Sequence, residues 1–392
     1  MEKTKDNDML KGVNEDEKNG KISTVQLSLI MMTAVGLKNH VTILPHLLPS
    51  AKRDGWISVL LAFGLIMIWC LLLFYIHKST GQTNIFVWVE TNIGKAPGRM
   101  LSIVISICFA SLAAVSLKEM VVWTKVSYLP VTPPIFEIIL FTGFCFFLAS
   151  TNIQTIAITN TFVLFAVILF GFFVAIANIQ FKNYSLLQPI LEHGWSPVFS
   201  GMIYPLSGLI ELIVILFMQQ KVHGKIKYKV FALNTIILTW LILGPLIGSI
   251  TEFGPLEASR QKYPAFEQWG LVTLGRFIEH LDFLSIYQWL TGAFIRVSFL
   301  LFLSLEVLSI KKPLNKTILL IAYSVMLIVS NSFSFSDVIL YYIIKTIVLP
   351  VTFWFFLAFS ILLSIFVLFS NRKKRRSSSD VQKNAKATVQ TE

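Results

Sequence analysis

The sequence predicts an all-α polytopic membrane protein with ten transmembrane helices, arranged as two inverted five-helix repeats with broken first and sixth helices. Of its 392 residues, 55% are hydrophobic and only 14% are charged, whereas a soluble domain carries about a quarter charged residues. Ten apolar runs approach or exceed the roughly 20 residues that cross a bilayer. The first and sixth runs carry glycines and polar residues at mid-span, where polar groups are costly in hydrocarbon.

The ten runs define one membrane domain over residues 22–370, flanked by tails at residues 1–21 and 371–392. The runs cover about residues 22–48, 56–76, 100–123, 135–150, 155–177, 196–220, 229–250, 270–308, 315–333 and 338–370. The fourth run is short. Pro350 interrupts the tenth, and because proline breaks the helical hydrogen-bond ladder, we expect the tenth helix to cross from about Leu349.

The distribution of positive charge predicts that both tails are cytoplasmic. With the amino terminus inside, the predicted cytoplasmic segments hold 22 Lys and Arg residues and the outside loops hold 6, as the positive-inside rule requires. No short apolar core with a cleavage site follows the first tail, so it is not a cleaved signal peptide. The basic tail 371–392 is expected to stay beside the anionic inner leaflet.

Several classes of function are disfavoured. The three cysteines, Cys70, Cys108 and Cys145, lie far apart in apolar runs and suit neither a disulfide framework nor a metal site. The motifs of zinc proteases, phosphate-binding loops and nucleophile elbows are absent. The basic residues are not interleaved with aromatic residues as in proteins that bind single-stranded nucleic acid. We therefore expect no enzymatic activity, no cofactor, no metal and no nucleic-acid partner.

The two broken helices are the predicted ligand-binding region. The candidate residues are Gly36, Leu37, Lys38 and Asn39 in the first run, and Tyr204, Pro205, Ser207 and Gly208 in the sixth. An unwound stretch exposes backbone groups that lipid cannot satisfy, and interrupted segments in corresponding halves of a chain point to a transporter-type binding site. The alternative is that the glycines only let helices pack closely and that Pro205 makes a kink.

The charged residues within the predicted spans leave several roles open. Lys38 is expected to pair with a ligand carboxylate, to pair with Glu211 across the bundle, or to face a water-filled cavity. Lys118 and Glu119 are expected to reach the outer interface. The outer end of the eighth run suggests a gate or a proton-coupling site formed by Arg276, Glu279 and Asp282, and Glu211 of the sixth run is a further coupling candidate. The alternative is a self-contained ion pair between Arg276 and Glu279, which are three residues apart and share a helical face. Residues 251–269 are expected to be a solvated connector rather than a lid.

The order and spacing of short motifs suggest a family. These motifs are the break at Gly36 followed by Pro45, the loop Leu129 to Pro133, the stretch Gly208 to Glu211, the stretch Arg276 to Glu279 followed by Trp289, and the basic tail after the tenth run. Together they resemble the GerAB/GerKB-type B subunits of endospore germinant receptors over nearly the whole chain.

The resemblance implies a branch of the amino acid/polyamine/organocation transporter superfamily, in which substrate lies between the broken first and sixth helices. It also implies a place in the inner membrane of the spore, a small nutrient ligand, and assembly with an A-type subunit and a lipoprotein C-type subunit. By the same analogy, Ser111, Val115, Ser285 and Gln288 on the third and eighth helices would complete the pocket.

The leading hypothesis is therefore a subunit that senses an amino acid, nucleoside or sugar and signals to its partner subunits. The rival is a proton- or sodium-coupled secondary amino acid transporter of the same architecture, for which Glu211, Glu279 and Asp282 are the coupling candidates. A third hypothesis is a scaffold without a ligand, which the cost of polar groups at mid-membrane disfavours.

Overall fold

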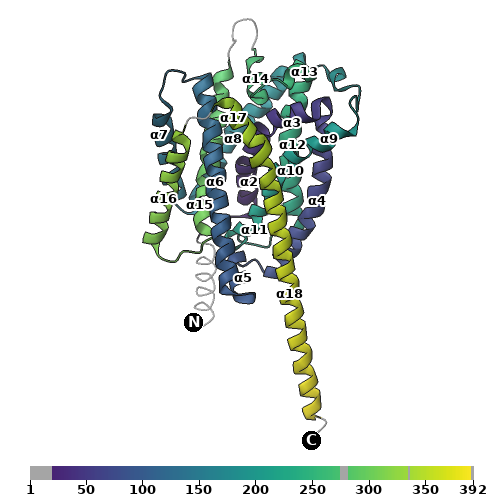
Figure 1. Cartoon of the computed structure of the whole chain (residues 1–392), viewed down its shortest axis with the longest axis vertical. Coiled ribbons are helices and arrows are strands. Elements are labelled where there is room, and N and C mark those ends of the chain that lie inside the picture. The colour runs from purple at the N-terminus through teal and green to yellow at the C-terminus, as the bar shows by residue number, and fades with distance from the viewer. Residues whose placement is uncertain (1–19, 274–280, 334–335, 390–392) are drawn as a thin grey trace, which may run out of the picture.

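The fold is an all-α helical bundle. The computed structural model describes residues 20–273, 281–333 and 336–389, with side chains described up to residue 372. Within these residues the chain forms helices and no β-strand, apart from one isolated bridge between Ile22 and Val222. Most of the long helices run side by side along the long axis of the bundle (Figure 1). The predicted fold class, an all-α polytopic membrane protein, is confirmed.

The α-helices follow one another closely along the chain. They are α2 (Thr24–Leu37), α3 (Leu44–Ala51), α4 (Gly55–Thr80), α5 (Ile85–Asn92), α6 (Lys95–Ser127), α7 (Pro134–Ala149), α8 (Ile153–Ala177), α9 (Trp195–Gly201), α10 (Ile203–Leu209), α11 (Val214–Met218), α12 (Tyr228–Phe253), α13 (Pro255–Ala258), α14 (Pro264–Gly270), α15 (Leu284–Glu306), α16 (Pro313–Ser332), α17 (Asp337–Ile343) and α18 (Leu349–Val389).

Eight helical stretches in the described part of the chain are long and apolar enough to cross a membrane. One of them, Leu44–Thr80, joins α3 and α4 through a 3₁₀ turn. Two further apolar helices, α2 with 14 residues and α7 with 16, are shorter than the roughly 17–25 residues of a typical span. The expected number of ten crossings therefore stays a prediction.

One end of the bundle gathers the segments predicted to be cytoplasmic. The backbone N–H of Ile22 donates to the carbonyl of Lys221 at 2.8 Å, and the side chain of Gln82 donates to the carbonyl of Val222 at 2.9 Å. Near the last span, the hydroxyl of Ser370 donates to the side chain of Asn92 at 3.1 Å. Both ends of the described chain thus lie at the same end of the bundle, at the bottom of Figure 1.

The opposite end gathers the segments predicted to lie outside. The carboxylate of Asp54 accepts from the backbone N–H of Leu191 at 3.0 Å, and Lys262 pairs with Asp337 at 2.7 Å. The charge count and the packing therefore agree on which loops share a side. Which side faces the cytoplasm stays a prediction.

The first broken segment bends through a π-helical turn. Ser23 begins α2 with a capping box, in which Ser23 and Gln26 exchange hydrogen bonds, and α2 ends at Leu37. Residues Lys38–Thr42 then form a π-helix, and α3 follows with Pro45 in its first turn. We expected this stretch to be unwound, and that expectation is wrong because the stretch is helical. The backbone stays hydrogen-bonded with one wider turn, a feature frequent at functional sites.

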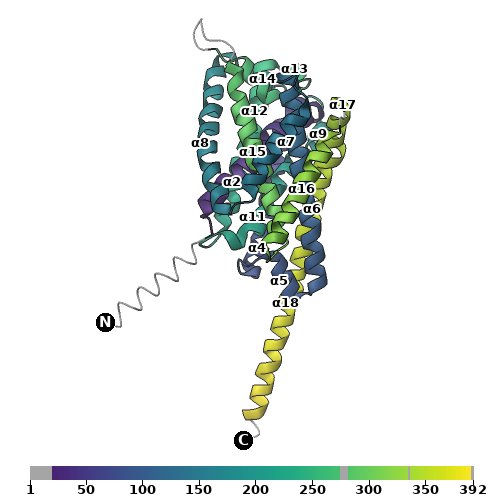
Figure 2. The ribbon, with the colours of Figure 1, turned by 90° about the vertical axis from the view of Figure 1, so that its left-hand side faces the viewer.

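The sixth segment is broken twice. Met202 separates α9 from α10, and a 3₁₀ turn at Ile210–Ile213 separates α10 from α11. Pro205 lies in the first turn of α10, where its missing N–H costs little. Of the most apolar part of this segment, 89% is buried, against 17% for α8 and for α16. The sixth segment is therefore central, and α8 and α16 lie at the periphery (Figure 2).

The neighbours of the two broken segments correspond in part. The first segment packs through α2 against α8, α12 and α15, and the sixth packs through α10 against α18 and α4. If the first five segments correspond to the second five, α8 matches α18 and α12 matches α4, but the packing of α2 against α15 has no comparable counterpart between α10 and α6. The arrangement as two repeated halves therefore stays a prediction.

The last helix extends beyond the bundle. α18 begins at Leu349, next to Pro350, after a π-helical turn at Ile344–Val348. The helical stretch long enough to cross a membrane runs from Asp337 to Arg372, so a crossing that starts at about Leu349 stays a prediction. α18 continues as one helix to Val389, and its final part projects from the bottom of the bundle (Figure 1, Figure 2). The basic tail predicted at 371–392 is thus helical over its described residues.

Candidate functional site

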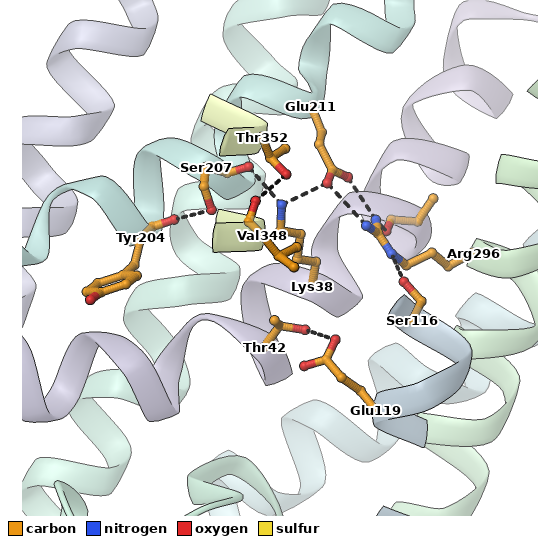
Figure 3. Close-up of polar contacts among 11 residues, drawn as sticks. Lys38, Thr42, Ser116, Glu119, Tyr204, Ser207, Glu211, Arg296, Val348 and Thr352 are labelled. Atoms are coloured by element: carbon orange, nitrogen blue, oxygen red, sulfur yellow. Dashed lines mark hydrogen bonds and ion pairs between the residues drawn. The ribbon is translucent and has the colours of Figure 1, made fainter. Parts of the chain in front are cut away.

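Glu211 joins three segments of the bundle through two buried cations. Its carboxylate lies 2.8 Å from the Nζ atom of Lys38 and 2.8 Å from the Nη1 atom of Arg296, and Nη2 of Arg296 donates to it at 3.1 Å. The three side chains are only 3–4% exposed. We call Lys38, Glu211 and Arg296 the ion cluster (Figure 3).

The remaining donors of the ion cluster are largely occupied by neighbouring oxygen atoms. Lys38 donates to the backbone carbonyl of Ser207 at 2.9 Å, and Nε of Arg296 donates to the hydroxyl of Ser116 at 2.8 Å. Nη1 of Arg296 also donates to the carbonyl of Ala34. Such additional hydrogen bonds are what a buried ion pair requires to offset the loss of its water.

The interruptions in the first and sixth segments position Lys38 and Glu211. Lys38 is the first residue of the π-helical turn, and Glu211 lies in the 3₁₀ turn that follows α10. Arg296 comes from the middle of α15, and Ser116 comes from α6. The ion cluster and its immediate partner therefore tie together the first, third, sixth and eighth segments.

A small cavity lies beside the ion cluster, between the first, third and eighth segments. It has room for about one water molecule. Its wall combines a cationic side, a carboxylate and apolar surface, and it is made by Leu37, Lys38, Val41, Thr42, Ser116, Glu119, Trp289 and Arg296. Glu119 accepts a hydrogen bond from the hydroxyl of Thr42 at 3.0 Å, apart from the ion cluster (Figure 3).

An aromatic cluster borders the cavity toward the end of the bundle predicted to lie outside. Trp289 stacks on Trp123, with ring centroids 4.2 Å apart, and contacts the ring of Tyr263 edge-on at 5.3 Å. Tyr128 and Phe266 pack against Trp123 at 5.4 and 5.7 Å. We call these five residues the aromatic cap.

The aromatic cap corrects the expectation for residues 251–269. This segment folds into α13 and α14, with Gln268 and Trp269 buried, and it contributes Tyr263 and Phe266 to the cap. It is a packed cover rather than a solvated connector. Its apolar and aromatic side chains are more stable when they pack against α6 and α15 than when they are exposed to water.

The predicted residues of the first segment separate into two groups. Leu37 and Lys38 line the cavity. Gly36 instead faces α12, where an added Cβ atom would lie 2.7 Å from the end of the Leu241 side chain. Asn39 is fully buried against Gly208, and its amide makes no hydrogen bond within the described part of the chain.

The predicted residues of the sixth segment are all buried. Ser207 serves the ion cluster through its backbone carbonyl, while its hydroxyl donates to the carbonyl of Tyr204 at 3.0 Å. The phenol of Tyr204 accepts from Ser50 at 3.3 Å, and Pro205 packs within α10. Gly208 makes room for Asn39, because any side chain at position 208 would collide with Oδ1 of the Asn39 side chain.

The third segment meets the cavity one helical position away from the prediction. Ser111 is exposed and Val115 packs in the partly buried layer, whereas Ser116 and Glu119 line the cavity. Glu119 was expected at the outer interface beside Lys118. Adjacent helix residues point about 100° apart, so Lys118 reaches the carbonyls of Asn331 and Phe333 while Glu119 turns inward.

The predicted residues of the eighth segment lie away from the cavity wall. Ser285 donates to the carbonyl of Asp282 and lies 3.3 Å from the hydroxyl of Tyr128. Gln288 accepts from the indole of Trp269 and donates to the carbonyl of Val167, both at 2.9 Å. Arg276 and Glu279 lie outside the described residues, so the predicted outer gate stays a prediction.

Five residues of the site were not among the predicted ligand or coupling residues: Thr42, Ser116, Glu119, Trp289 and Arg296. Glu119 and Arg296 carried a usable signal, since a charged residue within a span marks a functional position by default. Thr42 and Ser116 carried none, because small polar residues are common in membrane helices. Within the described residues, no group of three or more His, Cys, Asp or Glu is placed to hold a metal ion.

Comparison with known proteins gives two matches across this region. A model of the family described as "Spore germination protein" matches residues 21–337, which include the ion cluster and the cavity. The chain is also 40% identical over 354 residues to spore germination protein XB of Bacillus anthracis. That alignment covers 90% of this chain and 99% of the relative.

Proposed function

The chain belongs to the spore germination protein family as a multi-pass, permease-like membrane protein, and from this premise we propose that it is the nutrient-sensing subunit of a germination receptor. It lies in the inner membrane of the spore, with both termini on the cytoplasmic side. It binds a small nutrient, an amino acid, nucleoside or sugar, and signals to an A-type subunit and a lipoprotein C-type subunit.

The observation that carries this proposal is the carboxylate of Glu211, shared by Lys38 and Arg296 beside a cavity. Lys38 and Arg296 each form part of the cavity wall and also hold the sixth segment through Glu211. A ligand that moves either cation therefore moves the sixth segment relative to the first and eighth. Because the cavity wall and the sixth segment share these two side chains, no further structural element is needed to carry the movement from one to the other.

The fully buried contact of Asn39 with Gly208 provides a second link between the same segments. Because Asn39 directly follows Lys38, a shift of the π-helical turn acts on the sixth segment at both contacts. A ligand changes the population of two conformations only as far as its affinity for them differs. On this proposal, the nutrient binds better to the arrangement in which these contacts are altered, and the partner subunits respond to that arrangement.

The test is spore germination, followed as loss of optical density. Spores deleted for this gene are challenged separately with amino acids, nucleosides and sugars, and then complemented with the native gene, Glu211→Gln or Glu306→Gln. We expect deletion to remove the response to one nutrient class, and Glu211→Gln to fail to restore it. Glu306→Gln is the matched control, since Glu306 pairs with Lys221 at the surface of the bundle.

Immunoblots of spore membranes keep the outcomes separate. Loss of response with a normal amount of Glu211→Gln protein supports sensing through the ion cluster. A deletion strain that responds fully to every nutrient would refute the proposed function.

A coupled amino acid transporter remains the second candidate, and the position of Glu119 favours it. A carboxylate that faces a cavity within the membrane, in hydrogen-bond contact with Thr42, is a suitable group for proton or sodium coupling. Uptake of labelled amino acids into vesicles that contain this protein alone separates the candidates. Uptake that collapses with the ion gradient supports transport, whereas a response that requires the partner subunits supports sensing.

A further inference from the structure

The hydrogen-bonding groups of the cavity wall differ in how far they are satisfied. Lys38 and Arg296 direct their donors to Glu211 and to neighbouring oxygen atoms. Glu119 accepts a hydrogen bond from Thr42, and no Lys, Arg or His nitrogen within the described ranges lies close enough to pair with it. An ionised carboxylate offers about four acceptor sites. The spare capacity of the cavity is therefore mainly that of an acceptor.

The shape and the apolar part of the wall suit a small cationic group. The room for about one water molecule matches the size of a single –NH₃⁺ group rather than that of a carboxylate. Trp289 also lines this wall, with one face of its indole stacked on Trp123. Leu37 and Val41 complete an apolar side for the carbon chain next to such a group.

The negative charge of Glu119 extends to the aromatic cap. Burial, and then the charges of Asp337 and Glu119, raise the pKa of the Tyr263 phenol, which lies in the segment before α14. Tyr263 contacts Trp289, which separates the cap from the cavity. The ammonium of Lys262 lies 5.2 Å from the centroid of the Tyr263 ring and pairs with Asp337, so Glu119 is the carboxylate near the cap that no such pair neutralises within the described residues.

We propose that Glu119 binds a positively charged ammonium group of the ligand, with Trp289 as the adjoining wall, and that the aromatic cap covers the route of entry. The inference rests on the proposed function and narrows it to nutrients that carry a protonated amine. A carboxylate on the ligand is not required. Admission of the rest of the molecule requires Trp289 and Tyr263 to move apart.

The test measures binding to the purified full-length protein in lipid nanodiscs by the shift of its thermal unfolding midpoint at constant ionic strength. The probes are n-propylammonium, propionate and propan-1-ol, which share a carbon chain and differ in the end group, together with potassium chloride. We expect propylammonium alone to raise the midpoint. Glu119→Gln should increase its apparent Kd about tenfold or more, because a charge-assisted hydrogen bond is lost.

Two variants control this measurement. Glu257→Gln makes the same chemical change on an exposed carboxylate of the outer segment and should leave binding unchanged. Glu119→Asp keeps the charge on a shorter side chain and should retain part of the affinity, which covers the case in which Glu119→Gln fails to fold. Binding of propionate, an equal effect of potassium, or unchanged binding by Glu119→Gln would overturn the inference.

Spore assays separate this inference from the proposed function. If deletion of the gene removes a nutrient response and Glu119→Gln restores it with native sensitivity, the ammonium site is refuted and the sensing function stands. If deletion removes no response, the sensing function fails whatever the nanodiscs show.

Discussion

The ion cluster and the pair between Lys221 and Glu306 use the same kinds of charge in different surroundings. Glu211 and its two cations are 3–4% exposed at the centre of the bundle. The side chains of Lys221 and Glu306 are 33% and 15% exposed at the end predicted to be cytoplasmic, with an N–O distance of 3.1 Å. Both sites join the sixth segment to the eighth, but only the first is removed from water.

The difference decides what each site contributes. An ion pair that water reaches contributes about 0–1 kcal/mol, because water solvates both partners once they separate. A buried pair adds little net stability compared with apolar residues, yet loss of one partner leaves an uncompensated charge that costs about 3–5 kcal/mol. The ion cluster is therefore poorly explained as a device for stability. It is better explained as a contact whose rearrangement changes the free energy of the protein by a large amount.

Removal of the shared carboxylate should have the largest effect. Glu211→Ala leaves Lys38 and Arg296 buried without their counter-charge, so we expect a loss of about 3–5 kcal/mol in the free energy of unfolding. Urea unfolding of the purified protein in mild detergent, followed by tryptophan fluorescence, measures this loss. A change below about 1 kcal/mol would mean that water reaches the ion cluster, and the contrast with Lys221 and Glu306 would disappear.

Replacement of the whole ion cluster should separate stability from signalling. In the triple variant Lys38→Met, Glu211→Met and Arg296→Met, all three charges of the ion cluster are removed together, and buried ion clusters replaced by apolar residues often lose no stability. We expect unfolding within about 2 kcal/mol of the native protein, together with complete loss of the nutrient response. A triple variant that germinates normally would assign the ion cluster a purely structural role.

The fold was largely predictable because apolar runs and loop charges act locally. The long apolar runs are mostly helical over their described residues, although the first and sixth are interrupted. The alternation of Lys and Arg grouped the loops as the packing groups them at the two ends of the bundle. The resemblance to germinant receptor B subunits is also confirmed by the family match. The form of the first break was not predictable. Whether residues 38–42 unwind or form a π-helical turn depends on the packing of their neighbours, which the local sequence does not encode.

The sequence predicted which segments form the site, but not which face of each helix points into it. The Lys38–Glu211 pair was one of three alternatives for Lys38, and the structure selects it and adds Arg296. The sequence left the choice open because Tyr204, Ser207 and Glu211 share one helical face, and such a face can lie against a ligand or against another helix. On the third segment, Ser111 and Val115 were predicted, whereas the cavity is lined by Ser116, which follows Val115 and points about 100° away from it, and by Glu119.

The two glycines of the broken segments should respond differently to the same substitution. In Gly208→Ala the new methyl group collides with Asn39 and Ile43, which are buried, so we expect a loss of about 1–3 kcal/mol. In Gly36→Ala the methyl group meets only the movable end of Leu241, and we expect less than about 1 kcal/mol. Unfolding midpoints and germination rates of both variants test this order. Equal losses would show that the contact between Asn39 and Gly208 is not special.

The smallest effect is expected at the end of the bundle. Glu306→Ala should cost about 1 kcal/mol or less, and the cost should disappear as salt rises from about 0.1 to 1 M, where the screening length falls from about 10 to 3 Å. The cost of Glu211→Ala should persist over the same range, since mobile ions do not enter the buried centre. The two salt titrations therefore test whether water reaches one site and not the other, independently of the size of either loss of stability. If both losses fall together with salt, the ion cluster is hydrated, and a ligand could not use its rearrangement to move the sixth segment.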